Sequence, residues 1–180
     1  MSSIMPPFNF KQWIDDNRDK LKPPVCNKQV YEAGDFIIMV VGGPNIRKDY
    51  HDDASEEFFY QIEGEMVLRI REDGKAKDIK IKAGEIFLLP AHVHHSPQRF
   101  ENSVGLVIER KRNEDELDGF VWYCDECDAK IHEEYIPLKS ITEDLPKVFS
   151  GFWDSEENRT CNECGHVLQK PEQPALKQAS

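Results

Sequence analysis

The chain has 180 residues, a length that suits one domain of ordinary size with a small additional unit. Its 34 acidic and 23 basic residues give a net charge of −11, which argues against nucleic acid and acidic membranes as principal partners. No apolar run approaches the roughly 20 residues of a membrane-spanning helix, and the N-terminus has no secretory leader pattern, so we expect a cytoplasmic protein.

The first predicted element is a short amphipathic helix within residues 9–21. Its apolar side chains Phe10, Trp13 and Ile14 recur at helical spacing, and Asn9 can cap the first turn. Two prolines follow the helix and end it, because the residue before a proline disfavours the helical conformation. An extended segment is expected to begin just after them.

Short strands separated by glycine turns are predicted from there to about residue 109. β-branched and apolar runs alternate with turn sequences rich in glycine, aspartate and asparagine. The pattern is typical of an antiparallel sandwich or small barrel. The expected strands occupy residues 36–41, 58–62, 66–71, 78–82, 86–90 and 104–109.

The composition changes after a charged connector at residues 110–119. Two Cys-x-x-Cys pairs bracket a segment with a predicted helix near residues 139–149. We therefore divide the chain into a barrel with its N-terminal helix (1–110), a four-cysteine metal-binding appendage (111–169) and a flexible tail (170–180).

Two histidines and a carboxylate are candidate ligands of one catalytic metal. His51, Glu57 and His95 each stand next to a predicted strand, and two His with one carboxylate on a common face suit non-haem Fe(II). Such a site leaves open positions where a substrate and dioxygen can bind side by side. His94 is the main rival to His95, and His92 is a weaker one; otherwise both are surface groups.

The order of turn glycines and candidate ligands along the chain resembles that of a known superfamily. Residues 51–64 follow the pattern H-x-D-x3-E-x6-G, and residues 84–95 follow G-x5-P-x-H-x2-H. Both are similar to the two motifs of the cupins, which implies an all-β jelly-roll barrel, a double-stranded β-helix. Asp53 stands where many cupins have a second histidine, so a four-ligand site is not expected. His92 replaces the usual glycine, so the turn there can differ.

Longer segments narrow the resemblance to one family. VVGGPN-x-R-x-DYH (40–51), EEFFYQ (56–61), FLLP (87–90), HSPQR (95–99) and VIER (107–110) resemble the 3-hydroxyanthranilate 3,4-dioxygenases. The likeness runs from PFNF near the start to the second cysteine pair. It implies Fe2+-dependent ring cleavage of 3-hydroxyanthranilate with O2 as co-substrate, in the kynurenine route of tryptophan metabolism to quinolinate and NAD. It also implies a homodimer.

The chemistry of that substrate suggests roles for individual residues. Its carboxylate needs a local cation in so acidic a protein, and Arg99 can supply a bidentate guanidinium; a surface ion pair is the equal alternative. Glu109 ends an apolar strand, where it can accept the substrate's hydroxyl proton or simply pair with a neighbouring cation. The resemblance adds Arg47 as a catalytic and substrate-binding residue, Asp49 as its neighbour behind the site, and further substrate contacts by Glu57, Asn27, Val25, Phe59 and Pro97.

The cysteines form a second metal motif. Cys124, Cys127, Cys161 and Cys164 make two Cys-x-x-Cys pairs, and four thiolates suit a tetrahedral zinc or iron ion with a structural role. The resemblance implies a rubredoxin-like iron in microbial members. Gly165 fits the turn after the second pair, whereas Asp128 in the first is a departure. Cys26 lies outside this set and is either an oxidation-sensitive thiol or inert.

Two other functions compete with ring cleavage at this point. Another cupin oxygenase or isomerase acting on a different small acid would keep the three metal ligands, but would not need Arg47, Arg99 and Glu109 together. A non-catalytic cupin sensor with a zinc-ribbon contact module would need no iron. Iron content separates the sensor from the enzymes, and substrate-dependent oxygen uptake separates the two enzymes.

Overall fold

The computed structural model describes residues 4, 6–23, 25–139 and 141–172, without the side chains of 141 and 142. Residues 173–180, most of the tail that the sequence predicts to be flexible, lie outside this description. The described elements are α1 (Phe10–Asp16), β1 (Asn27–Gln29), β2 (Phe36–Gly42), β3 (Asp49–Asp52), β4 (Glu57–Glu63), β5 (Glu65–Glu72), β6 (Lys75–Lys82), β7 (Ile86–Leu89), β8 (His95–Arg99), β9 (Val104–Arg110), β10 (Asp118–Tyr123), β11 (Lys130–Ile136), α2 (Ile141–Trp153) and α3 (Glu156–Arg159).

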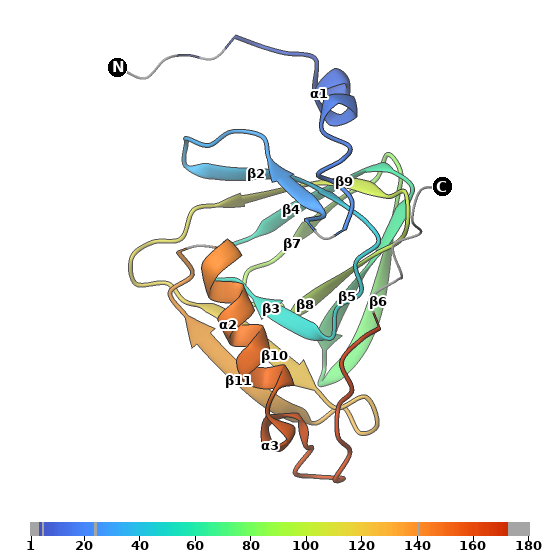
Figure 1. Ribbon diagram of the computed structural model, residues 1–180, viewed down its shortest axis with the longest axis vertical. Coiled ribbons are helices and arrows are strands. Elements are labelled where there is room, and N and C mark those ends of the chain that lie inside the picture. The colour runs from blue at the N-terminus through green and yellow to red at the C-terminus, as the bar shows by residue number, and fades with distance from the viewer. Residues whose placement is uncertain (1–3, 5, 24, 140, 173–180) are drawn as a thin grey trace.

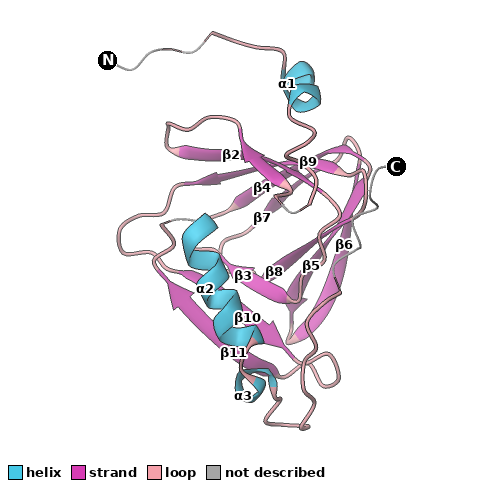
Figure 2. Ribbon diagram, in the orientation of Figure 1, coloured by secondary structure: helices cyan, strands magenta, loops and turns pink. Residues whose placement is uncertain are grey.

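The strands form two antiparallel sheets that face each other (Figures 1 and 2). One sheet has the order β1-β2-β9-β4-β7, and the other has the order β11-β10-β3-β8-β5-β6. From β2 to β10 the chain repeatedly crosses from one sheet to the other, so sheet neighbours are distant in sequence, except for the hairpin of β5 and β6. This is the jelly-roll topology of the cupin double-stranded β-helix, and the all-β prediction is confirmed.

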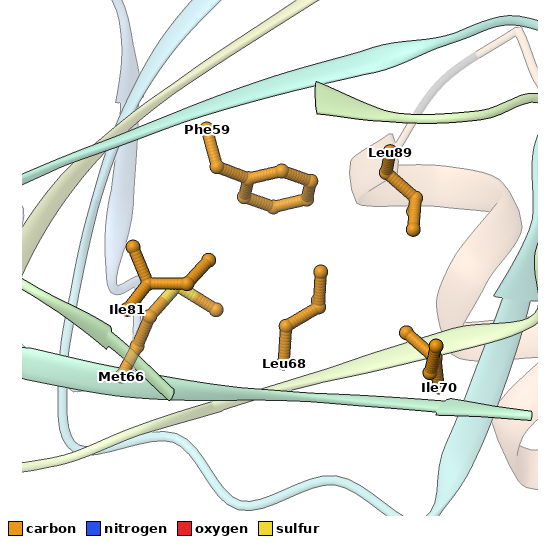
Figure 3. Close-up of a cluster of buried hydrophobic side chains, with 6 residues drawn as sticks. All are labelled: Phe59, Met66, Leu68, Ile70, Ile81 and Leu89. Atoms are coloured by element: carbon orange, nitrogen blue, oxygen red, sulfur yellow. The ribbon is translucent and has the colours of Figure 1, made fainter. Parts of the chain in front are cut away.

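An apolar core fills part of the space between the sheets. Side chains from four strands point toward one another there (Figure 3). They are Phe59, Met66, Leu68, Ile70, Ile81 and Leu89, each at most 7% exposed. Alternate residues of β5 enter this core, as expected for a strand with one buried face. Phe59 also borders the polar part of the interior, because its ring centroid lies 6.4 Å from that of His95.

The predicted N-terminal helix is observed as α1, which packs against one end of the barrel (Figure 1). The Gln12 amide donates a 2.9 Å hydrogen bond to the Asn9 side chain, which confirms the predicted cap. Ile14 and Leu21 pack with Val40 of β2 and Val104 of β9. The apolar face of the helix therefore belongs to the barrel core.

The segment after residue 110 continues the barrel sheet. β10 pairs with β3, and β11 pairs with β10, so the six-stranded sheet runs without a break into this segment. The predicted helix is observed as α2. Its residues Val148 and Phe152 pack on Trp122 of β10, with the Trp122 and Phe152 rings stacked at 4.1 Å. The predicted division of the chain into two units at residue 110 remains a prediction. The two units share the six-stranded sheet.

Candidate metal and substrate site

Three strands, two from one sheet and one from the other, bring the predicted ligands together between the sheets. His51 lies on β3, Glu57 opens β4, and His95 opens β8 opposite His51 in the strand register. Glu57 Oε1 is 3.3 Å from His51 Nδ1 and 2.9 Å from His95 Nε2. Glu57 is 5% exposed and His95 is 2% exposed, so the group is shielded from water.

The hydrogen bonds behind each imidazole show what these atoms can bind. His95 Nδ1 lies 2.9 Å from the Val93 carbonyl oxygen, which can only accept, so Nδ1 carries the proton and Nε2 keeps a lone pair. His51 Nε2 lies 2.7 Å from Asp118 Oδ1, which leaves the His51 lone pair on Nδ1. Both lone pairs face one carboxylate oxygen of Glu57, which has no hydrogen bond from the described residues. Three acceptors around one point fit a bound cation.

The electrostatics of His51 also indicate a site for positive charge. Burial lowers the pKa of His51, but the hydrogen bonds to Asp118 and Glu57 outweigh burial and raise the pKa to about 10. Without a metal ion, a proton serves as the cation between these carboxylates. A divalent ion bound by the same atoms satisfies that demand more fully, and it displaces the proton.

The neighbouring histidines point elsewhere. His94 Nδ1 lies 2.7 Å from the Tyr123 hydroxyl, and His92 Nδ1 lies 3.1 Å from Asp52 Oδ1. His92 has φ +59°, the left-handed conformation that glycine adopts most easily, so the turn keeps the geometry for which the cupin motif uses glycine. The choice of His95 over its two rivals agrees with this geometry.

Arg99 is a buried cation that makes no salt bridge with the residues that the structure describes. The side chain ends β8, is 3% exposed, and its Nη1 receives no hydrogen-bond partner among the described residues. Burial, and then the nearby charge of Arg47, lower the pKa of Arg99 to about 10. Gly105 makes room for it, since a Cβ there would lie 2.7 Å from Nη1. A buried guanidinium without a carboxylate indicates a place for an anion from solution.

Glu109 lies across from the ligands on β9, paired with Glu57 in the strand register. Burial, and then the charge of Glu57, raise the pKa of Glu109 to about 7, although Arg112 opposes the rise. Arg112 Nη1 is 2.9 Å from Glu109 Oε1. The carboxyl group is therefore poised to exchange a proton near neutral pH, as a general base requires.

A cavity of about 190 Å³ joins these groups. Asn27, Phe59 and Pro97 line it as predicted, together with Arg47, which pairs with Asp49. Val25 is 55% exposed and lies outside the lining, so the structure does not bring it to the site. The segment after residue 110 contributes walls that the sequence did not predict: Arg112, Phe120, Leu138 and Leu145.

Two residues at the site, the buried Asp118 and the partly buried Arg112, were missed by sequence reasoning. Asp118 is 1% exposed and accepts the His51 hydrogen bond, and Arg112 joins Asp118 to Glu109. Both lie in a charged stretch, 110–119, that reads as a solvated connector. One clue was available, since Asp118 directly precedes the apolar run GFVWY of a buried strand.

The four cysteines converge in a separate cluster. The sulfur atoms of Cys124 and Cys164 are 3.6 Å apart, as are those of Cys127 and Cys161, and all four lie within 4.8 Å of one another. Bonds of about 2.3 Å to a tetrahedral metal place sulfur atoms roughly 3.8 Å apart, whereas a disulfide is about 2.0 Å long. The cluster fits one tetrahedral metal ion.

The two cysteine turns have the same backbone form despite their different sequences. Asp128 has φ +62° and Gly165 has φ +75°. Arg71 of β5 holds Asp128 in this strained conformation through 2.7 Å and 3.0 Å bonds to its carboxylate and carbonyl. The sequence departure at Asp128 therefore leaves the first turn with the same left-handed backbone conformation as the second. Cys26 is buried away from both sites, and burial raises the pKa of its thiol, which favours the inert reading.

A double-stranded β-helix with two histidines and a glutamate gathered inside it defines a metal-binding cupin. The chain belongs to the 3-hydroxyanthranilic acid dioxygenase family, whose model matches residues 1–153. It is 53% identical to the 3-hydroxyanthranilate 3,4-dioxygenase of Xanthomonas campestris pv. campestris, covering 98% of this chain and 99% of that protein. The enzyme of the same name from Burkholderia cenocepacia is 54% identical, over 93% and 95%.

Solved structures include a cupin-2 domain protein from Shewanella frigidimarina, with a TM-score of 0.46 and 20% identity over 54% of this chain and 92% of that one. Within the described residues, none of the helices has the length and apolar character to cross a bilayer.

Proposed function

We propose that the protein is a ring-cleaving dioxygenase that converts 3-hydroxyanthranilate and O2 to 2-amino-3-carboxymuconate semialdehyde. The observation that carries this proposal is Arg99, a buried guanidinium with no anionic partner, beside a two-histidine, one-glutamate cluster. A small aromatic acid that also carries a ring hydroxyl group beside an amine satisfies both, because its carboxylate can bind Arg99 while the hydroxyl and amine face the cluster. Family membership and the names of the full-length relatives support the same substrate.

His51, Glu57 and His95 would hold Fe2+. When bound, the ion supplies adjacent positions for the substrate's oxygen and for dioxygen, and donates electron density to dioxygen. The neutral imidazoles and the carboxylate are the donor set that suits this ion. The four cysteines would hold iron or zinc, since a thiolate tetrahedron accepts both.

The remaining side chains divide the work of binding and proton transfer. Arg99 holds the substrate carboxylate through two parallel N–H···O bonds and so fixes the ring orientation. Glu109 accepts the hydroxyl proton as the substrate binds, because its raised pKa of about 7 matches the task. Arg47, held by Asp49, lines the same cavity and would contact the substrate or dioxygen there. Phe59 and Pro97 exclude water from the ring faces.

Both oxygen atoms of O2 enter the product, and the carbon bond beside the hydroxyl carbon breaks. The semialdehyde then closes on its own amine to give quinolinate, a precursor of NAD, with loss of water. The direct test is anaerobic loading with Fe2+, addition of 3-hydroxyanthranilate and air, and parallel recording of oxygen uptake and product absorbance. One O2 consumed per substrate, with a transient semialdehyde, supports the proposal. No turnover with iron bound at the His/Glu cluster would refute this substrate.

An apolar patch suggests that the protein works as a homodimer. On the outer face of the five-stranded sheet, Leu88, Phe58, Ile108 and Ile38 lie in one row across four strands. Leu88 is 54% exposed, and its neighbour Ile86 is 66% exposed, on an edge strand. A second copy would cover this surface. Light scattering should give a dimer for the native chain and a monomer for Leu88→Glu.

We propose a cytoplasmic location, because the state of the cysteines suits a reducing compartment. Five free cysteines, four of them gathered as metal ligands, require a reducing compartment.

A further inference from the structure

The strand after the barrel connector reaches back to a metal ligand. Asp118 begins β10, is 1% exposed, and receives the His51 Nε2 hydrogen bond at 2.7 Å. Phe120, opposite His51 in the strand register, stacks on the same imidazole with ring centroids 5.4 Å apart and planes inclined by 20°. Two residues of β10 thus fix the position and the rotation of one ligand.

Arg112 ties this support to the other side of the cavity. Its guanidinium lies 2.7 Å from Asp118 Oδ1, 2.9 Å from Asp53 Oδ2 and 2.9 Å from Glu109 Oε1. A planar fork with donors in several directions can serve three carboxylates at once, which an ammonium group does less well. Because this cation occupies the space between the three carboxylates, they form a frame around Arg112 rather than another metal site.

We propose that Asp118 and Arg112 are positioning residues of the ring-cleavage site. Asp118 holds His51 with Nδ1 turned toward the metal, and Arg112 keeps Asp118 and Glu109 in one rigid frame. The inference deepens the proposed function and rests on it for the role of Glu109. Its part concerning His51 rests only on the metal cluster. The connector and β10 accordingly belong to the active site, although they follow the barrel strands.

The test compares conservative variants with matched controls in the full-length protein. Asp118→Asn keeps a hydrogen-bond acceptor and removes the charge, and Arg112→Lys keeps the charge and removes the fork. Asp52→Asn is the control for Asp118→Asn, because Asp52 is a buried carboxylate next to His51 in sequence that accepts a hydrogen bond from Tyr135. Arg110→Lys is the control for Arg112→Lys, because Arg110 is an arginine of the same connector that pairs with Glu116. Thermal unfolding verifies that each variant folds.

Two readouts separate positioning from general stability. Equilibrium dialysis under anaerobic conditions measures Fe2+ affinity at the His/Glu cluster, with iron at the cysteine cluster followed separately by its thiolate absorbance. We expect Asp118→Asn to weaken Fe2+ binding by roughly 10- to 100-fold, as losses of such indirect partners do. We expect Arg112→Lys to lower kcat by at least about tenfold with KM nearly unchanged, since Arg99 still binds the substrate. Both controls should stay within about twofold of the native protein.

Native Fe2+ affinity in a folded Asp118→Asn variant would overturn the role of Asp118. An Arg112→Lys variant with native kcat would overturn the role of Arg112. If the native protein bound iron but did not cleave 3-hydroxyanthranilate, the proposed function would fail alone, because the affinity measurement would still decide the role of Asp118.

Discussion

The two candidate metal-binding clusters of this molecule are built in opposite ways. The cluster of His51, Glu57 and His95 takes its ligands from three strands, buried between the sheets, with a cavity and an unpaired arginine beside it. The cysteine cluster takes its ligands from two short turns near the surface, where Cys127 and Cys164 are exposed. Four thiolates complete a tetrahedron and leave no position for a substrate.

This difference in ligand number, burial and neighbouring space shows which cluster has room for a catalysed reaction. An incomplete, buried ligand set beside a cavity leaves room for substrates, whereas a closed set near the surface joins chain segments. Arg112 pairs with Asp53 of the barrel and with Asp118 at the start of β10, so this end of the strand is tied to the barrel. Cys124 of the cysteine cluster follows the other end of β10, and we expect changes at that cluster to leave Asp118 in place.

The largest effect is expected from removal of a barrel ligand. His95→Ala should lose Fe2+ from the barrel cluster and lower turnover by more than about 100-fold, because even indirect partners of a metal cost 10- to 100-fold. Metal analysis and oxygen uptake measure both losses. His94→Ala is the matched control, since the adjacent histidine bonds Tyr123 outside the cavity. Equal losses in the two variants would contradict the ligand assignment.

Removal of the proton acceptor should come next. Glu109→Gln keeps the shape of the side chain but cannot take the hydroxyl proton, so kcat should fall by about 10²- to 10⁴-fold with iron retained. Single-turnover kinetics of the iron-loaded variant measure the change. A variant with native kcat would show that Glu109 serves only the Arg112 frame.

Loss of the carboxylate-binding cation should act mainly on substrate binding. Arg99→Ala should raise KM by about two orders of magnitude, because truncating one partner of a buried charge pair costs about 2–5 kcal/mol. Arg99→Lys should recover part of this loss, since an ammonium group lacks the bidentate geometry. Arg69→Ala, which breaks a surface pair with Asp78, is the control. An unchanged KM in Arg99→Ala would remove this role.

The pH dependence of turnover should show a smaller effect. The pKa of Glu109 is raised to about 7, and the residue acts when deprotonated. Turnover (kcat) should therefore rise with pH through a midpoint set by this pKa and then level off. A bound metal cation favours the carboxylate, which puts that midpoint at or below about 7. Below it, activity should fall about tenfold per pH unit. A rate profile from pH 5 to 8 measures this limb, and its persistence in Glu109→Gln would assign it to another group.

The cysteine cluster should affect stability and leave the rate almost unchanged. The double variant Cys161→Ser, Cys164→Ser should have a Tm lower by about 10 °C or more. A structural metal contributes several kcal/mol to the free energy of unfolding, and each kcal/mol shifts Tm by about 2–4 °C in a protein of this size. Turnover at 20 °C, per barrel-bound iron, should remain within about twofold. A folded variant with abolished turnover would break the separation between the two clusters.

A feature could be predicted from the sequence when the residues that form it are close together in the chain. The cysteine pairs, the Asn9 cap and the glycine turns depend on residues a few positions apart, and the structure agrees with them. The barrel ligands were found through motif order, although they meet only through strand register. Arg112 and Asp118 were missed because their burial depends on β10 joining β3, 66 or more residues away in sequence. Apart from the apolar run that follows Asp118, the local sequence around these two residues is the same as that of a solvated charge run.

The most direct test of the account is an iron titration of metal-free protein that carries Cys161→Ser and Cys164→Ser, in the presence of 3-hydroxyanthranilate and air. The account predicts that oxygen uptake rises linearly and saturates at one Fe2+ per chain, with about the native rate per bound iron. Iron bound at one equivalent without oxygen uptake, while the native protein turns over, would contradict the claim that the barrel cluster alone performs the reaction.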